Sequence, residues 1–270
     1  MGGTGQVLRE DVDALFVPEG DHLVPTVFAV GPWRPDSVHG AAVAALFAAA
    51  LDREEKTVAR ITLDMLATVP LAPLHLDVTD EVGGRRVQRR TAALRDGERV
   101  VAQAHAMYVT ESPVELPPSV DGFPGPPADL ALLPEERSGW PGFENRSIAL
   151  HTRRAGESSV HGWFRLLVPA VADGPLTGLQ MALAAADYTS AGTALVLSLR
   201  RFTFMSIDLT VNLARRPAGD WVGLEAARSV LDGSGIGVAS SSLHDARGVC
   251  GRCIETQLVR ALPRTQRPSA

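Results

Sequence analysis

The chain has 270 residues, of which 45% are hydrophobic and 21% charged, and its formal net charge is −5. This length and composition predict a folded globular protein with one large domain or two of ordinary size. The mildly acidic balance is not that of a nucleic-acid-binding protein, so nucleic acid is excluded as an expected partner.

The first residues, MGGTGQVLRED, show neither the apolar region of a signal peptide nor the Ser or Thr of a myristoylation signal. The longest apolar run, AAVAALFAAAL (41–51), is too short to span a bilayer. We therefore expect a cytoplasmic protein without a membrane span.

The first predicted element is a helix over residues 36–55, with Asp36 after Pro35 as its N-cap. Its predicted buried stripe consists of Val43, Leu46, Phe47, Ala50 and Leu51. His39 and Gly40 lie at the start of this helix, where unpaired backbone N–H groups suit an oxygen that becomes negative during a reaction. A histidine packed in the core is the alternative interpretation of His39.

Three strand-like runs follow this helix, over residues 59–69, 74–95 and 98–109. The middle run carries a basic stretch, GGRRVQRR, with Arg85, Arg86, Arg89 and Arg90. Successive side chains of a strand point to opposite faces, so these arginines cannot all contact one ligand. We expect a solvated hairpin here.

Residues 111–145 are dense in proline and glycine and show no sustained periodicity, so we expect a linker. A second helix is predicted over residues 175–190. Asp187 lies three, four, seven and eight residues after Ala184, Leu183, Gln180 and Leu179, on the stripe that a helix turns toward its core. A carboxylate there is costly unless it has polar partners, whereas a rotated helix would point it to water.

Three further strand-like runs follow, over residues 205–215, 221–245 and 249–259, and we expect the tail, 263–270, to be disordered. Two short motifs in this half resemble known sites. GSGIG (233–237) lacks the strand, glycine spacing and helix of a dinucleotide loop, and CGRC (250–253) lacks the helix of a redox site. One nearby histidine does not complete the four ligands of a closed zinc site, so no metal is expected.

The two halves repeat the same order of elements, in which one helix is followed by three strand-like runs. The turns between the later runs are too short for parallel crossovers, so the sheets should be antiparallel. The sequence therefore predicts an α+β protein with two similar units, over residues 1–110 and 146–262, each wrapping a sheet around one apolar helix.

Five stretches in this order, GPWRPDSVHGAAVAAL, ITLDMLATVPLAPLHLDV, GRRVQ, LQMALAAADYTSAG and SIDLTVNLAR, resemble the double-hotdog acyl-CoA thioesterases of the thioesterase II type. The resemblance covers most of the chain outside the expected linker and tail. It implies a tandem hotdog fold that hydrolyses an acyl-CoA or acyl-carrier thioester with water, without a covalent intermediate. It implies no cofactor, and homo-oligomeric assembly is a further expectation.

The resemblance also assigns site residues. The family's catalytic acid matches Asp187, and its strand-opening threonine matches Ser206, which keeps the hydroxyl. Its glutamine in the last strand matches Glu255, a departure from the family pattern, while Gln257 lies two residues farther on, about 7 Å along the strand, and is expected to bind substrate. Either the glutamate has replaced the amide or the register is displaced. Asp187 would deprotonate the attacking water, with Ser206 and Glu255 completing its surroundings.

Three other functions are alternatives to thioester hydrolysis. A hotdog hydratase needs an Asp and a His around an Asn-Pro insertion, which Asp36 and His39 lack. A serine hydrolase needs a G-x-S-x-G turn, which the sequence lacks. A double-hotdog protein that binds acyl thioesters without cleaving them remains open, because Glu255 replaces the family's amide.

Overall fold

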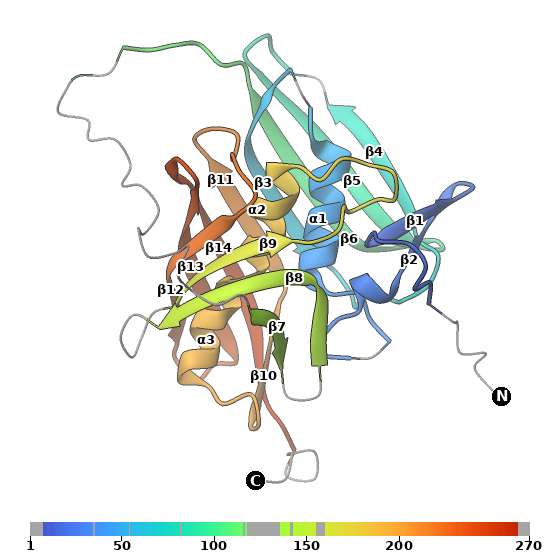
Figure 1. Cartoon of the computed structure of the whole chain (residues 1–270), viewed down its shortest axis with the longest axis vertical. Helices are drawn as coiled ribbons and strands as arrows, with labels where there is room; N and C mark the ends of the chain where they lie inside the picture. The colour runs from blue at the N-terminus through green and yellow to red at the C-terminus, as the bar shows by residue number, and fades with distance from the viewer. Residues whose placement is uncertain are drawn as a thin grey trace.

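The computed structural model describes residues 8–34, 36–53, 55–81, 83–115, 117, 136–140, 143–154 and 160–263. Each half of the chain places an apolar helix against an antiparallel sheet, and the two helices lie next to each other in the middle of the molecule (Figure 1).

The N-terminal unit opens with a short hairpin, β1 (Phe16–Glu19) and β2 (His22–Pro25), and a 3-10 turn, η1 (Val27–Ala29). Its central helix and four sheet strands are α1 (Gly40–Leu51), β3 (Thr57–Met65), β4 (His75–Glu81), β5 (Val87–Asp96) and β6 (Arg99–Val109). The long run predicted over residues 74–95 is thus a hairpin of two strands.

Helix α1 begins four residues later than the sequence predicts, and its N-cap is His39 rather than Asp36. The preceding segment is held in extended backbone by neighbouring loops, since His39 N–H donates to the Ala29 carbonyl at 2.8 Å and Val38 N–H to the Val69 carbonyl at 2.9 Å. Asp36 instead forms an exposed ion pair with Arg34 at 2.8 Å. Backbone hydrogen bonds to loops remote in sequence therefore override the local preference for Asp36 as the N-cap.

The C-terminal unit contains the helical segments α2 (Gly178–Ala186), η3 (Asp187–Ser190) and α3 (Ala191–Val196). Its strands are β7 (Glu136–Trp140), β8 (Phe143–Arg154), β9 (Val160–Leu166), β10 (Phe202–Ser206), β11 (Asp208–Leu213), β12 (Val222–Leu231), β13 (Ile236–Asp245) and β14 (Gly248–Ala261).

The predicted linker, residues 111–145, extends too far. Strand β7 and the first residues of β8 lie inside it, and β8 pairs with β9 in the main sheet. Backbone pairing between consecutive strands creates these elements, and a window without periodicity gives no signal for it. Most of the remaining expected linker and residues 264–270 of the expected tail lie outside the described residues.

Within the described residues, the two units share one 12-stranded sheet. Antiparallel pairing of β3 with β11 joins them edge to edge, with Thr62 opposite Thr210 near the centre of the joint. At the end of β10 the chain steps at Ile207 into β11, so both strands pair with β14. The two units thus form one continuous sheet.

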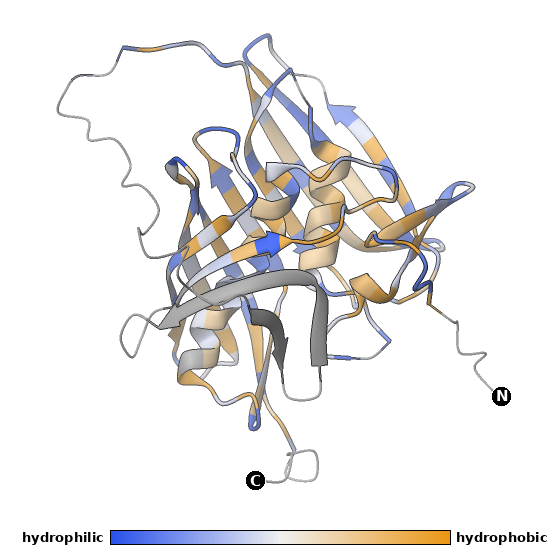
Figure 2. Cartoon of the chain, in the orientation of Figure 1, coloured by the Kyte–Doolittle hydropathy of each residue, from blue (hydrophilic) through white to orange (hydrophobic). Residues whose placement is uncertain are grey.

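Helix α1 is buried on almost every side, beyond the predicted stripe, because it contacts the sheet on one side and α2 on the other. Residues 41 to 48 are all buried, and five of these eight are alanines, which allow close approach of the two helices. The hydropathy colouring in Figure 2 shows both helices as apolar ribbons within the molecule. No helix among the described residues is long and apolar enough to cross a membrane.

The two short motifs have structural positions. GSGIG forms the turn between β12 and β13, with a strand and no helix after it. Cys250 and Cys253 are buried, unpaired thiols on β14, and burial raises the pKa of each to about 11. Both thiols are therefore protonated at neutral pH, in contrast to a redox site.

Arg216, which follows β11, ties the two units together at the end of α1. Its guanidinium forms an ion pair with the Asp52 carboxylate at 2.7 Å and donates to the carbonyls of Lys56, at 2.9 Å, and Arg53. Asp52 caps the C-terminus of α1, and its side chain is 14% exposed. One planar cation thus satisfies a carboxylate and two carbonyls of the other unit.

We expect Arg216→Met to lower the free energy of unfolding by about 2 kcal/mol, because it leaves a largely buried carboxylate and two carbonyls without their donor. Urea unfolding followed by circular dichroism measures this loss. Arg252→Met, at an exposed arginine of β14, is the matched control. Equal losses in the two variants would show that Arg216 does not hold the units together.

Candidate functional site

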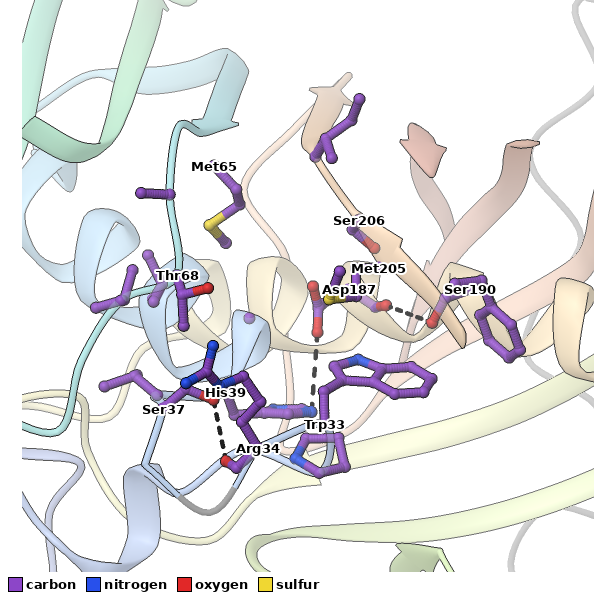
Figure 3. A pocket seen from close by; sticks show the side chains of 18 of the residues that line it. Trp33, Arg34, Ser37, His39, Met65, Thr68, Asp187, Ser190, Met205 and Ser206 are labelled. Atoms are coloured by element: carbon purple, nitrogen blue, oxygen red, sulfur yellow. Dashed lines mark hydrogen bonds and ion pairs between the residues drawn. The ribbon is translucent and has the colours of Figure 1, made fainter. Parts of the chain in front are cut away.

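A pocket of about 250 Å³ opens at the first turn of α1, between the two units (Figure 3). Its wall brings together segments distant in sequence, namely the loop before α1, the chain after β3, the start of η3 and the end of β10. Four of the six site residues expected from the sequence line it: His39, Gly40, Asp187 and Ser206.

Most of the remaining wall is apolar. It includes Trp33, Val43, Met65, Val69, Phe204, Met205 and Ile207. Trp33, in the loop before α1, packs its ring edge to face with Phe204 of β10, with centroids 5.4 Å apart. Sequence reasoning missed Trp33 and Phe204 because only the tertiary structure brings that loop and that strand together.

Asp187 lies where α2 ends and the tighter turn of η3 begins, and its side chain is 13% exposed. Burial raises the pKa of this carboxyl to about 7, while the backbone N–H of Ala41, in the first turn of α1, acts in the opposite direction. The end of one central helix therefore aims its acid at the N-terminus of the other.

Gly40 permits this approach. A Cβ atom on Gly40 would lie 2.5 Å from Asp187 Oδ1, a distance that real Cβ contacts essentially never show. The glycine in HGA is thus needed so that the carboxylate can reach the first turn of α1. Its conformation is ordinary for a helix, so the requirement is one of space.

His39 flanks the carboxylate, with Nε2 4.0 Å from Asp187 Oδ2, and its ring packs against Tyr188. Burial lowers the pKa of the imidazole to about 4, so it is neutral at neutral pH. Its Nδ1 meets no hydrogen-bond partner among the described residues. The backbone N–H of His39 donates to the Ala29 carbonyl at 2.8 Å, so it is not available to an oxyanion.

Ser206 connects the pocket to a buried acid behind its wall. Its Oγ lies 3.0 Å from Oε2 of Glu255, which is completely buried on β14. Glu255 does not itself line the pocket, so its expected contact with the reacting water passes through Ser206. Burial, and next the charge of Asp187, raise the pKa of Glu255 well above its ordinary value.

Gln257, expected to bind substrate, is fully buried and does not line the pocket either. It lies opposite Ser206 in the pairing of β14 with β10, and its Nε2 donates to Glu255 Oε1 at 2.6 Å. Its Oε1 accepts from Thr193 of α3 at 2.5 Å. Segment η3 and strand β10 pack against β14, and Thr193 of α3 contacts Gln257, so that Gln257 is kept from the pocket.

The two carboxyls differ in their order of ionisation. Asp187 ionises first, because it is partly exposed and faces an N–H group of α1. Glu255 keeps its proton to higher pH, because it is fully buried and the ionised Asp187 disfavours a second negative charge. Burial and the charge of the ionised Asp187 therefore both favour the protonated form of Glu255.

Other candidate sites do not converge on the pocket. Arg85, Arg86 and Arg89 are exposed, and Arg90 forms an ion pair with Asp80 at 2.5 Å across the β4–β5 hairpin. The solvated hairpin expected from the sequence is confirmed. Among the described residues, no group of three His, Cys, Asp or Glu side chains could hold a metal ion.

The raised pKa of Asp187 predicts a pH-dependent cost to stability. Because the folded protein binds this proton more tightly than the unfolded chain, stability should fall as pH rises from about 4 to about 7. Asp187→Asn cannot ionise, so it should match the wild type near pH 4 and exceed it by roughly 2 to 4 kcal/mol above pH 8. Chemical unfolding at several pH values measures the difference. A constant difference across this range would mean that Asp187 is solvated.

The chain is similar to known protein families and solved structures. The sequence profile of the acyl-CoA thioesterase N-terminal domain matches residues 29–109, and that of the C-terminal domain matches residues 113–259. A search of curated protein sequences finds no match.

Several solved structures share the fold. A protein assigned as a thioesterase II from Thermobifida fusca YX is 14% identical, with a TM-score of 0.69, covering 96% of this chain and 100% of its own. The acyl-CoA thioesterase II TesB2 from Mycobacterium marinum is 16% identical, with a TM-score of 0.61 and coverages of 96% and 97%. A hotdog-fold protein from Alicyclobacillus acidocaldarius is 15% identical, with a TM-score of 0.63 and coverages of 93% and 98%.

These likenesses confirm the double hotdog fold that the resemblance implies. The two profiles together span most of the chain and meet between the two units. The chain therefore belongs to the acyl-CoA thioesterase family.

Proposed function

We propose that this protein hydrolyses an acyl thioester with a water molecule that Asp187 activates. The observation that carries the proposal is a buried carboxylate with a pKa of about 7, facing an apolar pocket at a helix N-terminus. A base is most useful when its pKa lies near the working pH, because it is then both ionised and a strong enough proton acceptor.

In the proposed reaction, Asp187 accepts a proton from the water as the water oxygen bonds to the thioester carbonyl carbon. The carbonyl oxygen becomes negative in the tetrahedral intermediate, and the N–H of Gly40 is the candidate donor to it. When the carbon–sulfur bond breaks, the thiolate leaves and takes the proton from Asp187. The products are a carboxylic acid and a free thiol, and Asp187 is ionised again.

Ser206 is proposed to hold the water beside Asp187, because its hydroxyl is the polar group of β10 that lines the pocket. Glu255 acts through Ser206 and takes the place of the family's glutamine. A protonated carboxyl donates a hydrogen bond as an amide does, whereas an ionised carboxylate only accepts. The proposed active form therefore has Asp187 ionised and Glu255 protonated.

The apolar wall suits an acyl chain, and we propose acyl-coenzyme A or an acyl-carrier thioester as the substrate class. A cytoplasmic place in lipid metabolism and a homo-oligomeric state remain predictions. Light scattering during gel filtration tests the second of these.

A protein that binds acyl thioesters without cleaving them is the second candidate. The glutamate at position 255 favours it, because an ionised Glu255 would take the hydrogen of Ser206 and leave no donor toward the water. The two functions differ in one measurement, the release of free thiol.

We expect Asp187→Asn to lower thioester hydrolysis by roughly 100-fold or more, because it keeps the shape of the side chain and removes the base. Free-thiol release from a panel of acyl-coenzyme A esters of different chain length measures this. Asp36→Asn, at an exposed acid near the rim of the pocket, is the matched control. Equal rates in wild type and Asp187→Asn would eliminate the mechanism, and binding without thiol release in the wild type would favour the second candidate.

The pH profile of hydrolysis should have two limbs. Activity should rise as Asp187 ionises near pH 7, and fall at higher pH as Glu255 loses its proton. Glu255→Gln should keep the acid limb and lose the alkaline limb assigned to Glu255, since an amide does not titrate. An alkaline limb that is unchanged in this variant would place Glu255 outside the reaction.

A further inference from the structure

We infer that Thr193 and Gln257 are positioning residues, which confine the proton of Glu255 to Oε2 and so turn the hydroxyl hydrogen of Ser206 into the pocket. This inference rests on the proposed function and extends it to two residues that do not touch the pocket.

The direction of each hydrogen bond follows from the donors available. Thr193 donates its single hydroxyl hydrogen to Oε1 of Gln257, at 2.5 Å. The Ser229 hydroxyl lies 2.5 Å from the same Thr193 oxygen, so Ser229 is the donor in that pair. With its oxygen turned to Thr193, the Gln257 amide must present its NH₂ group to Glu255.

This orientation decides which oxygen of Glu255 carries the proton. Oε1 accepts from the Gln257 amide at 2.6 Å, so an acid proton on Oε1 would face another donor. The proton of the neutral acid therefore lies on Oε2, which is 3.0 Å from Ser206 Oγ. Glu255 then donates to Ser206, and the hydrogen of Ser206 is free to point at the bound water.

Ionisation of Glu255 reverses the last bond. The carboxylate accepts from Ser206 as well as from Gln257, and Ser206 then offers only lone pairs to the pocket. The state of a fully buried acid is thus passed to the pocket by rotation of one hydroxyl.

The charged groups around Glu255 do not by themselves determine which of its two oxygens carries the proton. Asp187 faces it from η3 and Asp208 from β11, and both are acidic. Cys253 lies on the same strand as a protonated thiol, and His39, beyond Asp187, is neutral. Negative neighbours favour a protonated Glu255 but do not choose between its oxygens. The Gln257 amide makes that choice.

Thr193→Val tests the inference, because it keeps the shape of the side chain and removes the donor that fixes the amide. Gln257 can then turn its oxygen to Glu255, and the acid proton can occupy Oε1. We expect kcat to fall about tenfold with little change in KM. The alkaline limb should move to higher pH, because the Glu255 carboxylate loses a fixed N–H donor.

Thr193→Ser keeps the hydroxyl donor, so it should have the rate and the alkaline limb of the wild type. Ser241→Ala is the control for losing a buried hydroxyl nearby, because Ser241 bonds to Thr189 and Cys253 outside this chain of contacts. If Thr193→Val does not fold, Gln257→Leu removes the amide and should shift the alkaline limb in the same direction.

Infrared titration gives a readout independent of turnover. The carbonyl stretch of protonated Glu255, identified by its loss in Glu255→Gln, should titrate at higher pH in Thr193→Val than in the wild type. An unshifted band with an unshifted alkaline limb would overturn the inference. If Asp187→Asn hydrolyses thioesters as fast as the wild type, the proposed function is overturned instead. The infrared titration of Glu255 would still test the hydrogen bonds.

Discussion

The structure depends on the contact between a buried carboxylate and the first turn of a neighbouring helix. The side chain of Asp187 is mostly withdrawn from water, which disfavours its ionised form. The N-terminus of α1 compensates only part of this desolvation cost, so the pKa of Asp187 is about 7. The contact requires a glycine at position 40, because any Cβ there would collide with the carboxylate. Small residues in HGA and AAAD thus make possible the close approach that gives the acid its properties.

The tandem arrangement supplies this contact. Joining β3 to β11 sets the two units side by side and brings the end of α2 against the beginning of α1. At the other end of the pair, Asp52 follows α1 as Asp187 follows α2, yet Asp52 is neutralised by Arg216. Two acids at matching helix ends therefore differ in whether a cation neutralises them. One holds the units together, and the other, among the described residues, has only His39 as an ion-pair partner, which is neutral at neutral pH.

Behind the pocket, Glu255 lies among polar neighbours that suit an acid. Ser206 and Gln257 each contact one oxygen of its carboxyl, and Thr193 orients the amide. A lone buried carboxyl would be costly, but one that keeps its proton and meets partners on both oxygens is tolerable. Its dependence on protonation is the property that distinguishes it from a glutamine.

The sequence by itself determined the repeat, the apolar helices, the antiparallel runs and the unusual position of Asp187, because periodicity and turn spacing are local properties of the chain. It did not determine the start of α1 or the place of Gln257, because loops and strands elsewhere in the chain decide these through backbone pairing. It also missed the strands inside the expected linker, because pairing between consecutive strands forms them without a periodic pattern. Trp33 and Thr193 carried no local signal, since their neighbours are remote in sequence. Only the tertiary structure decided that Glu255 lies behind Ser206, because residues on one face of a strand look alike until other elements cover them.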